Sequence, residues 1–148
     1  MTIHFKIGNH YFLSNFHEGH PFEMNDKTWK TAEHAYQAMK ADNEEGQEWV
    51  RKAVTPAIAK KRGRQVIIRS DWDEIKLQIM KSVVYHKFIL NTYLYSKLLD
   101  TGAEDLVEFT TWGDTYWGVD TNYNGENHLG KILMEVREKL YESIQIND

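Results

Sequence analysis

The stretch that decides the fold is residues 126–142, which read Glu-Asn-His-Leu-Gly-Lys-Ile-Leu-Met-Glu-Val-Arg-Glu-Lys-Leu-Tyr-Glu. Charged residues occupy one side of it, and its apolar residues recur three and four positions apart, at Leu129, Ile132, Leu133, Val136 and Leu140. That spacing is typical of an amphipathic helix with one face on a core. Residues 126–142 therefore predict a long helix that packs on the rest of the protein.

Further helices are predicted towards the N-terminus, over residues 31–42, 44–53, 55–63, from Ser70 or Asp71 to about 91, and 93–99. Thr55-Pro56 is a strong start, because Thr caps free amides and Pro suits the first helical position. Gly63 is expected in the left-handed position that ends this helix, and Ser70 or Asp71 is expected to cap the next one.

The β structure is predicted to be small. Residues 21–29 alternate around a turn at Asn25-Asp26 and predict a hairpin. Residues 10–16 predict a short extended segment, and residues 105–119 a short strand with loops. Regular strand–helix alternation is absent, so the fold class is mainly α, a single helical domain over 1–148 with a small N-terminal hairpin and short strands.

Composition excludes several classes of protein. The chain has 148 residues, with 18 Lys and Arg against 22 Asp and Glu, a net charge of −4 and no cysteine. Disulfides, thiol nucleophiles and cysteine metal sites are therefore excluded. No apolar run approaches the roughly 20 residues of a spanning helix, and the first residues do not resemble a leader peptide. We expect a cytoplasmic protein with no membrane association and no obligate protein partner.

The charge is distributed unevenly along the chain. Between Arg51 and Arg69 there is no acid, and there are seven basic residues: Arg51, Lys52, Lys60, Lys61, Arg62, Arg64 and Arg69. Such a basic segment in an acidic protein suggests attraction for phosphate. A solvated helix face, balanced by acids elsewhere in the fold, explains the same pattern.

Two clusters of residues can carry chemistry. In the first, Glu33, Tyr36, Gln37 and Lys40 share one face of the helix predicted over 31–42, which would present a carboxylate, a phenol, an amide and an amine together. An ordinary exposed Glu/Lys face is the alternative. The second cluster is residues 111–120, where aromatic rings and carboxylates suit a base or sugar ring; its candidates are Trp112, Asp114, Trp117 and Asp120. A loop anchored by tryptophan is the alternative there.

Other sites are weaker. Asn15 and Asn127 are candidate binding residues, although a turn residue and a helix cap explain them as well. His17, His20 and Glu23 match no established zinc spacing, so we predict no metal and no cofactor. The glycine-rich phosphate loop, the Rossmann fingerprint and the nucleophile elbow of serine hydrolases are all missing.

Taken in order, the motifs of the chain resemble the NADAR superfamily, also called YbiA-like. They are Phe12-Leu-Ser-Asn-Phe16, Trp29-x-Thr31-x-Glu33-His34-x-Tyr36-Gln37-Ala38-x-Lys40, Thr55-Pro56, Ala59, Gly63-Arg64, Lys87-Phe88, Leu98-Leu99-x-Thr-Gly102, Leu106-Val-Glu108, Trp112-x-Asp114, Trp117-Gly118, Asn127-x-Leu129-Gly130 and Leu133-Met134-x-x-Arg137. The resemblance covers nearly the whole chain. It departs from the family after Gly118, where residues 119–125 form a longer loop than many members have.

The resemblance implies an N-glycosidase that cleaves a ribose C1–N bond, either in phosphorylated intermediates of riboflavin synthesis or in ADP-ribosylated guanine of nucleic acid. A module that binds ADP-ribose or a related nucleotide without turnover is the alternative. Cleavage of this bond builds positive charge at C1′, which a carboxylate stabilises. We expect Lys40 as nucleophile or electrostatic partner and Glu33 as acid–base, with Asp114 or Asp120 as alternative carboxylates. The expected substrate contacts are Asn15, Tyr36, Gln37, Arg64, Trp112, Trp117 and Asn127, with Lys60 as a further cation.

Overall fold

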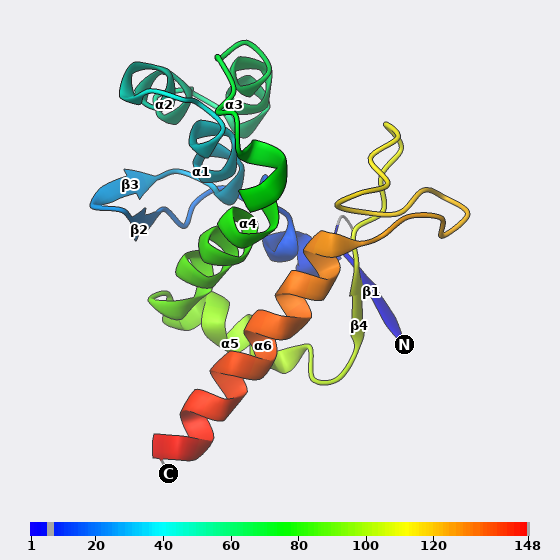
Figure 1. The fold of residues 1–148 in the computed structure, drawn as a ribbon. Coiled ribbons are helices and arrows are strands. Elements are labelled where there is room, and N and C mark those ends of the chain that lie inside the picture. The colour runs from blue at the N-terminus through cyan, green and yellow to red at the C-terminus, as the bar shows by residue number, and fades with distance from the viewer. Residues whose placement is uncertain (6–7, 148) are drawn as a thin grey trace. The chain divides into compact units, whose positions relative to one another are not determined.

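A computed structural model describes residues 1–5 and 8–147 of the chain, with side chains up to residue 145. The chain divides into two compact units (Figure 1). One consists of Met1–Ser14 together with the chain from Asn91 onward, and the other of Asn15–Leu90. Helices dominate both units and the strands have three residues each, which confirms the predicted mainly α fold class.

The unit Asn15–Leu90 begins with the predicted hairpin. Strands β2 (Phe22–Met24) and β3 (Lys27–Trp29) pair antiparallel, with Phe22 opposite Trp29. Asn25 and Asp26 both have positive φ, 54° and 61°, which is the backbone of the two-residue turn that suits a hairpin. Trp29 is fully buried and donates its indole N–H to the carbonyl of Met24 at 2.9 Å, so the hairpin is anchored through this ring.

Four helices follow: α1 (Ala32–Met39), α2 (Glu44–Arg51), α3 (Pro56–Gly63) and α4 (Trp72–Ile89). The first three begin as expected, because Thr31, Asn43 and Thr55 each accept a hydrogen bond from the backbone N–H three residues later. Helix α1 packs against α2, α3 and α4 and lies at the centre of this unit (Figure 1).

Two predictions about helix ends are wrong. Gly63 is the last residue of α3 and is absent from the positive-φ residues, so left-handed backbone is not the reason for this glycine. Asp71 precedes α4 but makes no side-chain capping bond, because its carboxylate pairs with Arg69 instead. Ser70 is exposed and does not directly precede the helix.

His34 fastens α1 to the segment between α2 and α3. Its ring is fully buried, with Nε2 2.9 Å from the carbonyl oxygen of Ala53 and Nδ1 2.8 Å from the hydroxyl of Thr31. The carbonyl can only accept, so Nε2 carries a proton and donates it to this oxygen. Burial lowers the pKa of His34 below its usual 6.5, and the nearby charge of Lys30 lowers it further.

This burial makes the stability of the protein sensitive to acid. Because the pKa of His34 is lower in the folded chain, the unfolded chain binds the proton more tightly. The contribution of neutral His34 to the free energy of unfolding is therefore complete above about pH 6.5, and it is lost as the pH falls towards the lowered pKa of the folded chain. Urea midpoints measured between pH 5 and 7.5 should fall more steeply for the wild type than for His34→Gln. His86→Gln is the control and should keep the wild-type slope; equal slopes for all three proteins would contradict the assignment.

The other unit contains the 3₁₀ helix η1 (Gly8–Leu13), strands β1 (Thr2–His4) and β4 (Asp105–Val107), and helices α5 (Thr92–Asp100) and α6 (His128–Asn147). The predicted extended segment over 10–16 is wrong up to Leu13, because the chain coils there and buries Phe12 and Leu13. Strands β1 and β4 pair in parallel, with Ile3 opposite Leu106.

Helix α6 confirms the pattern that predicted it. All five of its expected core residues are at most 4% exposed. Its Arg137 is buried and donates from Nη1 to the Thr101 hydroxyl and the Glu104 carbonyl, both at 2.9 Å. These bonds tie α6 to the end of α5.

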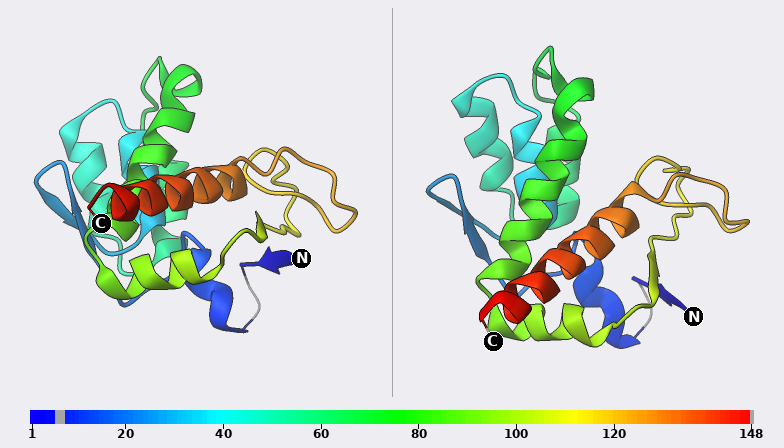
Figure 2. Two further views of the ribbon diagram at one scale, coloured as in Figure 1. Left: turned by 90° about the horizontal axis from the view of Figure 1, so that it is seen from below. Right: turned by 60° about the horizontal axis from the view of Figure 1, so that its bottom comes forward.

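The loop 108–127 (yellow to orange) extends beyond the start of α6 in both views of Figure 2. Over the residues the structure describes, none of the helices combines the length and apolar character needed to cross a membrane.

Candidate functional site

The predicted polar face of α1 exists, but it is not an ordinary exposed face. Glu33, Tyr36 and Gln37 are only 7%, 5% and 4% exposed, and Lys40 is partly exposed at the C-terminal end of the helix. Burying a carboxylate and an amide is unfavourable unless they are hydrogen-bonded. The exposed-face alternative is therefore wrong for these three residues, which leaves a polar cluster in need of internal partners.

Glu33 is held at the first turn of α1 by two contacts. Its backbone N–H donates to the carbonyl of Asn15 at 3.0 Å, and its carboxylate Oε1 accepts from Gln37 Nε2 at 2.7 Å. The N-terminal turn of a helix also favours a negative charge. Asn15 is itself buried and directs its side-chain amide to the sulfur of Met80 at 3.5 Å. Asn15 thus positions Glu33 through its backbone.

Lys40 has an aromatic neighbour. Its Nζ lies 5.6 Å from the centre of the Tyr36 ring, and that ring packs at 5.2 Å against Trp72, the first residue of α4. The backbone of Lys40 is fixed as well, because its carbonyl accepts the N–H of Arg69 at 2.9 Å. The Lys40 side chain therefore extends from a fixed backbone, and its amine lies beside the Tyr36 ring, which packs on Trp72.

The surroundings of Lys40 lower the pKa of its amine. Burial lowers the pKa of its ammonium group below 10.5, and Glu33 opposes this by raising it. Three cations lower the pKa further: Arg64, Lys60 and Lys76. A lysine that is desolvated and lies near other cations is the usual form of an activated amine nucleophile. The same three cations would attract a phosphate.

The cations of the basic segment 51–69 have different surroundings. Arg51 and Arg69 are neutralised by neighbouring acids, through two bonds each to Glu48 and Asp71. Arg62 instead donates to the carbonyl of Trp49 at 2.7 Å and lies over its ring. Some cations of the segment are thus neutralised by nearby acids, whereas Arg64 and Lys60 lower the pKa of the Lys40 amine.

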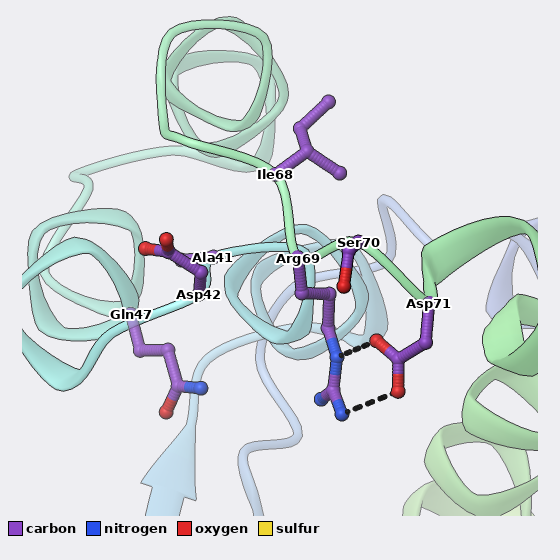
Figure 3. Close-up of a pocket in the computed structure, with 7 residues that line it drawn as sticks. All are labelled: Ala41, Asp42, Gln47, Ile68, Arg69, Ser70 and Asp71. Carbon is purple, nitrogen blue, oxygen red and sulfur yellow. Dashed lines mark hydrogen bonds and ion pairs between the residues drawn. The ribbon is translucent and has the colours of Figure 1, made fainter.

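An open pocket of about 540 Å³ begins at Ala41, the residue after Lys40 (Figure 3). It is lined by the chain around Ala41 and Asp42 and by residues 68–71. Arg69 turns its guanidinium onto Asp71, with bonds of 2.7 and 3.1 Å that the figure marks. Because this cation is already paired, the pocket is a poorer phosphate site than the surroundings of the Lys40 amine.

The aromatic cluster of residues 111–120 belongs to the unit that contains α6. Tyr116 and Trp117 accept the first N–H groups of α6 with their carbonyls, from His128 at 3.1 Å and Leu129 at 3.0 Å. The Tyr116 ring packs on His128 at 4.5 Å and meets Trp117 edge-on at 4.8 Å. Trp117 is therefore fixed, as the anchored-loop alternative expects, whereas Trp112 is 46% exposed.

The two aspartates of this loop hold turns. Asp114 Oδ1 accepts the backbone N–H groups of Tyr116 and Trp117 at 3.2 and 3.0 Å. Asp120 Oδ1 accepts those of Asn122 and Asn124 at 2.8 and 2.9 Å, which shapes the unusual loop over 119–125. Both aspartate carboxylates thus stabilise turns of the backbone, whereas the carboxylate of Glu33 is hydrogen-bonded to the side chain of Gln37.

Asn127 also has a structural task. Its backbone has a positive φ of 51°, its Oδ1 accepts from the N–H of Glu108 at 3.1 Å, and its Nδ2 donates to the carbonyl of Leu106 at 3.0 Å. These bonds join β4 to the start of α6. Gly130 is needed at the same contact, because a Cβ there would overlap the Leu106 carbonyl.

Two residues around the α1 cluster were not predicted, namely Trp72, which packs on Tyr36, and Lys76, whose charge acts on Lys40. Both come from the first turns of α4, and nothing in their local sequence points to α1. Lys87 is a second lysine with a lowered pKa, about 7, but it is only 3% exposed. Within the described part of the chain, no group of three His, Asp or Glu side chains is arranged to hold a metal ion. His17 and His20 contact each other at 2.9 Å between Nε2 and Nδ1.

The sequence was compared with those of known proteins. Residues 4–141 match the model of the NADAR domain. The chain is 40% identical to an N-glycosidase of Nostoc punctiforme over 147 residues, which cover 95% of this chain and 93% of that protein. It is 39% identical to a riboflavin biosynthesis protein of Vibrio vulnificus over 141 residues, 94% of this chain but only 38% of that protein.

A solved structure agrees with the fold. The NMR structure of the Escherichia coli protein YbiA superposes with a TM-score of 0.87 at 34% identity, covering 97% of this chain and 87% of that one. The predicted fold class is confirmed by this structure, and the predicted enzyme class by the relative named as an N-glycosidase. The family match spans both α1 with Lys40 and the loop before α6, and this chain belongs to the NADAR family.

Proposed function

We propose that this protein hydrolyses the bond between ribose C1′ and the nitrogen of a base in a phosphorylated riboside, with Lys40 as nucleophile and Glu33 as acid–base. The observation that carries the proposal is the Lys40 amine, whose pKa is lowered by burial and by three cations while a buried carboxylate lies on the same helix face. The relative named as a riboflavin biosynthesis protein supports a phosphorylated riboside as the substrate. The cytoplasmic location stays a prediction from the sequence.

The first step breaks the glycosidic bond. The neutral amine of Lys40 attacks C1′, a C–N bond forms, and the bond to the base breaks with its electron pair leaving on the base nitrogen. Glu33, in its protonated form, gives that nitrogen a proton. The bond between C1′ and the ring oxygen then breaks, and a proton of the Lys40 nitrogen passes to that oxygen, so the opened sugar is joined to Lys40 as a protonated imine.

The second step returns the enzyme to its starting state. Water adds to the imine carbon, with Glu33 taking a proton from the water as it attacks. The proton of the new C1′ hydroxyl then passes to the Lys40 nitrogen as the C–N bond breaks, which releases the sugar phosphate as an aldehyde and regenerates the neutral amine. The cations around Lys40 favour the neutral amine before the reaction and would bind the phosphate throughout.

A panel of substrates tests this proposal. The protein is incubated separately with phosphorylated ribosides of the riboflavin pathway, with ADP-ribosylated guanosine and with NAD, and released base and sugar are measured by mass spectrometry. We expect base release from the phosphorylated riboside. Release only from ADP-ribosylated guanosine would move the assignment to nucleic acid repair. Binding without any product would instead favour the alternative of a non-catalytic nucleotide-binding module.

Arg64 is expected to hold the substrate phosphate. The variant Arg64→Ala should raise KM roughly 10- to 100-fold, the range lost with one hydrogen bond to a charged group, and change kcat much less. Steady-state kinetics on the phosphorylated riboside measure this. Lys52→Ala is the matched control, since Lys52 is an exposed cation of the same basic segment at the end of α2. Equal increases in KM for the two variants would mean that Arg64 attracts the phosphate only through the overall positive charge of the segment.

A further inference from the structure

Helices α1 and α3 are in close contact where Gly63 meets Gln37. A Cβ atom at residue 63 would overlap Oε1 of Gln37 and lie 2.9 Å from its Cδ and 3.0 Å from its Cβ. Gly63 is buried and its backbone is helical, so any residue could adopt its conformation. The glycine is required because there is no room for a side chain.

The Gln37 carboxamide that occupies this room is oriented in one direction. Its Nε2 donates to Glu33 Oε1 at 2.7 Å, while its Oε1, buried against Gly63, accepts no hydrogen bond from the residues the structure describes. A buried acceptor without a hydrogen bond is rare and unfavourable. This contact thus carries a local energetic cost.

We infer that Gly63 is a positioning residue for Glu33, acting through Gln37: the missing side chain at 63 lets the carboxamide lie flat against α3 and aim its N–H groups at the carboxylate. This inference rests on the proposed function, in which Glu33 exchanges the proton. The hydrogen bond from Gln37 gives the Glu33 carboxylate a fixed direction, and fixed direction is what proton transfer to a leaving base requires.

The substitution Gly63→Ala tests the inference, because the new methyl group must displace the Gln37 carboxamide. Glu33 then loses the hydrogen bond from Gln37 Nε2, and its carboxylate is no longer held in one direction. We expect kcat to fall roughly 10- to 100-fold, the cost of a misplaced group, with KM changed only a few-fold. Hydrolysis of the imine needs Glu33 as a base, so the acidic limb of the pH–rate profile for this step should also move to higher pH, because the charged carboxylate loses a hydrogen bond that stabilises it.

Two further variants separate positioning from simple packing. Gly46→Ala is the matched control, since Gly46 also lies in a helix of the same unit and a Cβ there meets no atom closer than 3.0 Å. It should keep the wild-type rate and pH profile. Gln37→Ala should reproduce the shifted acidic limb, and adding Gly63→Ala to it should cause little further loss, because the overlap with the carboxamide is gone and only the 3.0 Å contact with the Cβ atom remains.

Each outcome decides the question. A wild-type rate and pH profile for Gly63→Ala overturns the inference, as does a full additional loss when it is combined with Gln37→Ala. If Gly63→Ala does not fold, as judged by circular dichroism, Gln37→Ala still decides, because an unshifted acidic limb refutes the role of the carboxamide. If Glu33→Gln itself keeps full activity, the proposed function fails rather than this inference.

Discussion

Replacing Lys40 by alanine is expected to lower kcat/KM for the phosphorylated riboside at least about 10⁴-fold, while the protein keeps its fold. The size of the effect follows from the role proposed for the amine, because loss of a nucleophile removes a whole reaction path and not one contact. Folding should survive, since Lys40 is partly exposed and caps α1 through its backbone. Circular dichroism and steady-state kinetics on the same preparation measure both.

Lys40→Arg is the informative partner of this variant. Arginine keeps the positive charge but stays protonated and does not attack carbon. An inactive Lys40→Arg therefore supports a nucleophilic amine, whereas substantial activity would reduce Lys40 to an electrostatic role.

Borohydride added during turnover provides the direct test. It should reduce the imine and leave the sugar phosphate attached to Lys40, as detected by peptide mass spectrometry. Lys87 is an internal control, because its pKa is lowered to about 7 but its side chain is buried and should stay unmodified. An active enzyme that forms no adduct would favour water activated by a carboxylate.

The parts of the fold that the sequence predicted correctly are those with long patterns or strong caps. Helix α6 has five apolar residues in register, and Thr55-Pro56 marks the start of α3. Strands β1 and β4 could not be found this way, because three residues are too few for an alternating pattern and about 100 residues separate the two partners. Residues 10–13 were misjudged because their aromatic composition favours a strand, while the chain coils to bury Phe12 and Leu13.

The candidate site shows the same division. Helical spacing predicted that Glu33, Gln37 and Lys40 share a face, and the bond between Glu33 and Gln37 confirms the geometry. Spacing could not predict that this face is buried, nor that Gly63 makes room for it. Glycine at a helix end usually signals left-handed backbone. Here its role depends on a neighbouring helix, and such a tertiary contact leaves no local pattern.

Replacing Glu33 by glutamine is expected to lower kcat by roughly 10²- to 10⁴-fold, the usual contribution of a positioned acid–base group. The amide has the size of the carboxylate and can still accept from Gln37, so α1 should stay intact. Glu45→Gln, at an exposed carboxylate on α2, is the control and should behave as the wild type.

The same variant makes a second prediction that does not require turnover. The charge of Glu33 raises the pKa of Lys40, so its removal should lower that pKa further. The Lys40 amine should then react at lower pH in Glu33→Gln than in the wild type. The pH dependence of its reductive methylation by formaldehyde and borohydride, followed by peptide mass spectrometry, measures this shift. Lost activity with an unshifted amine would mean that Glu33 acts on the substrate alone, while full activity would transfer the acid–base role to a carboxylate such as Asp114.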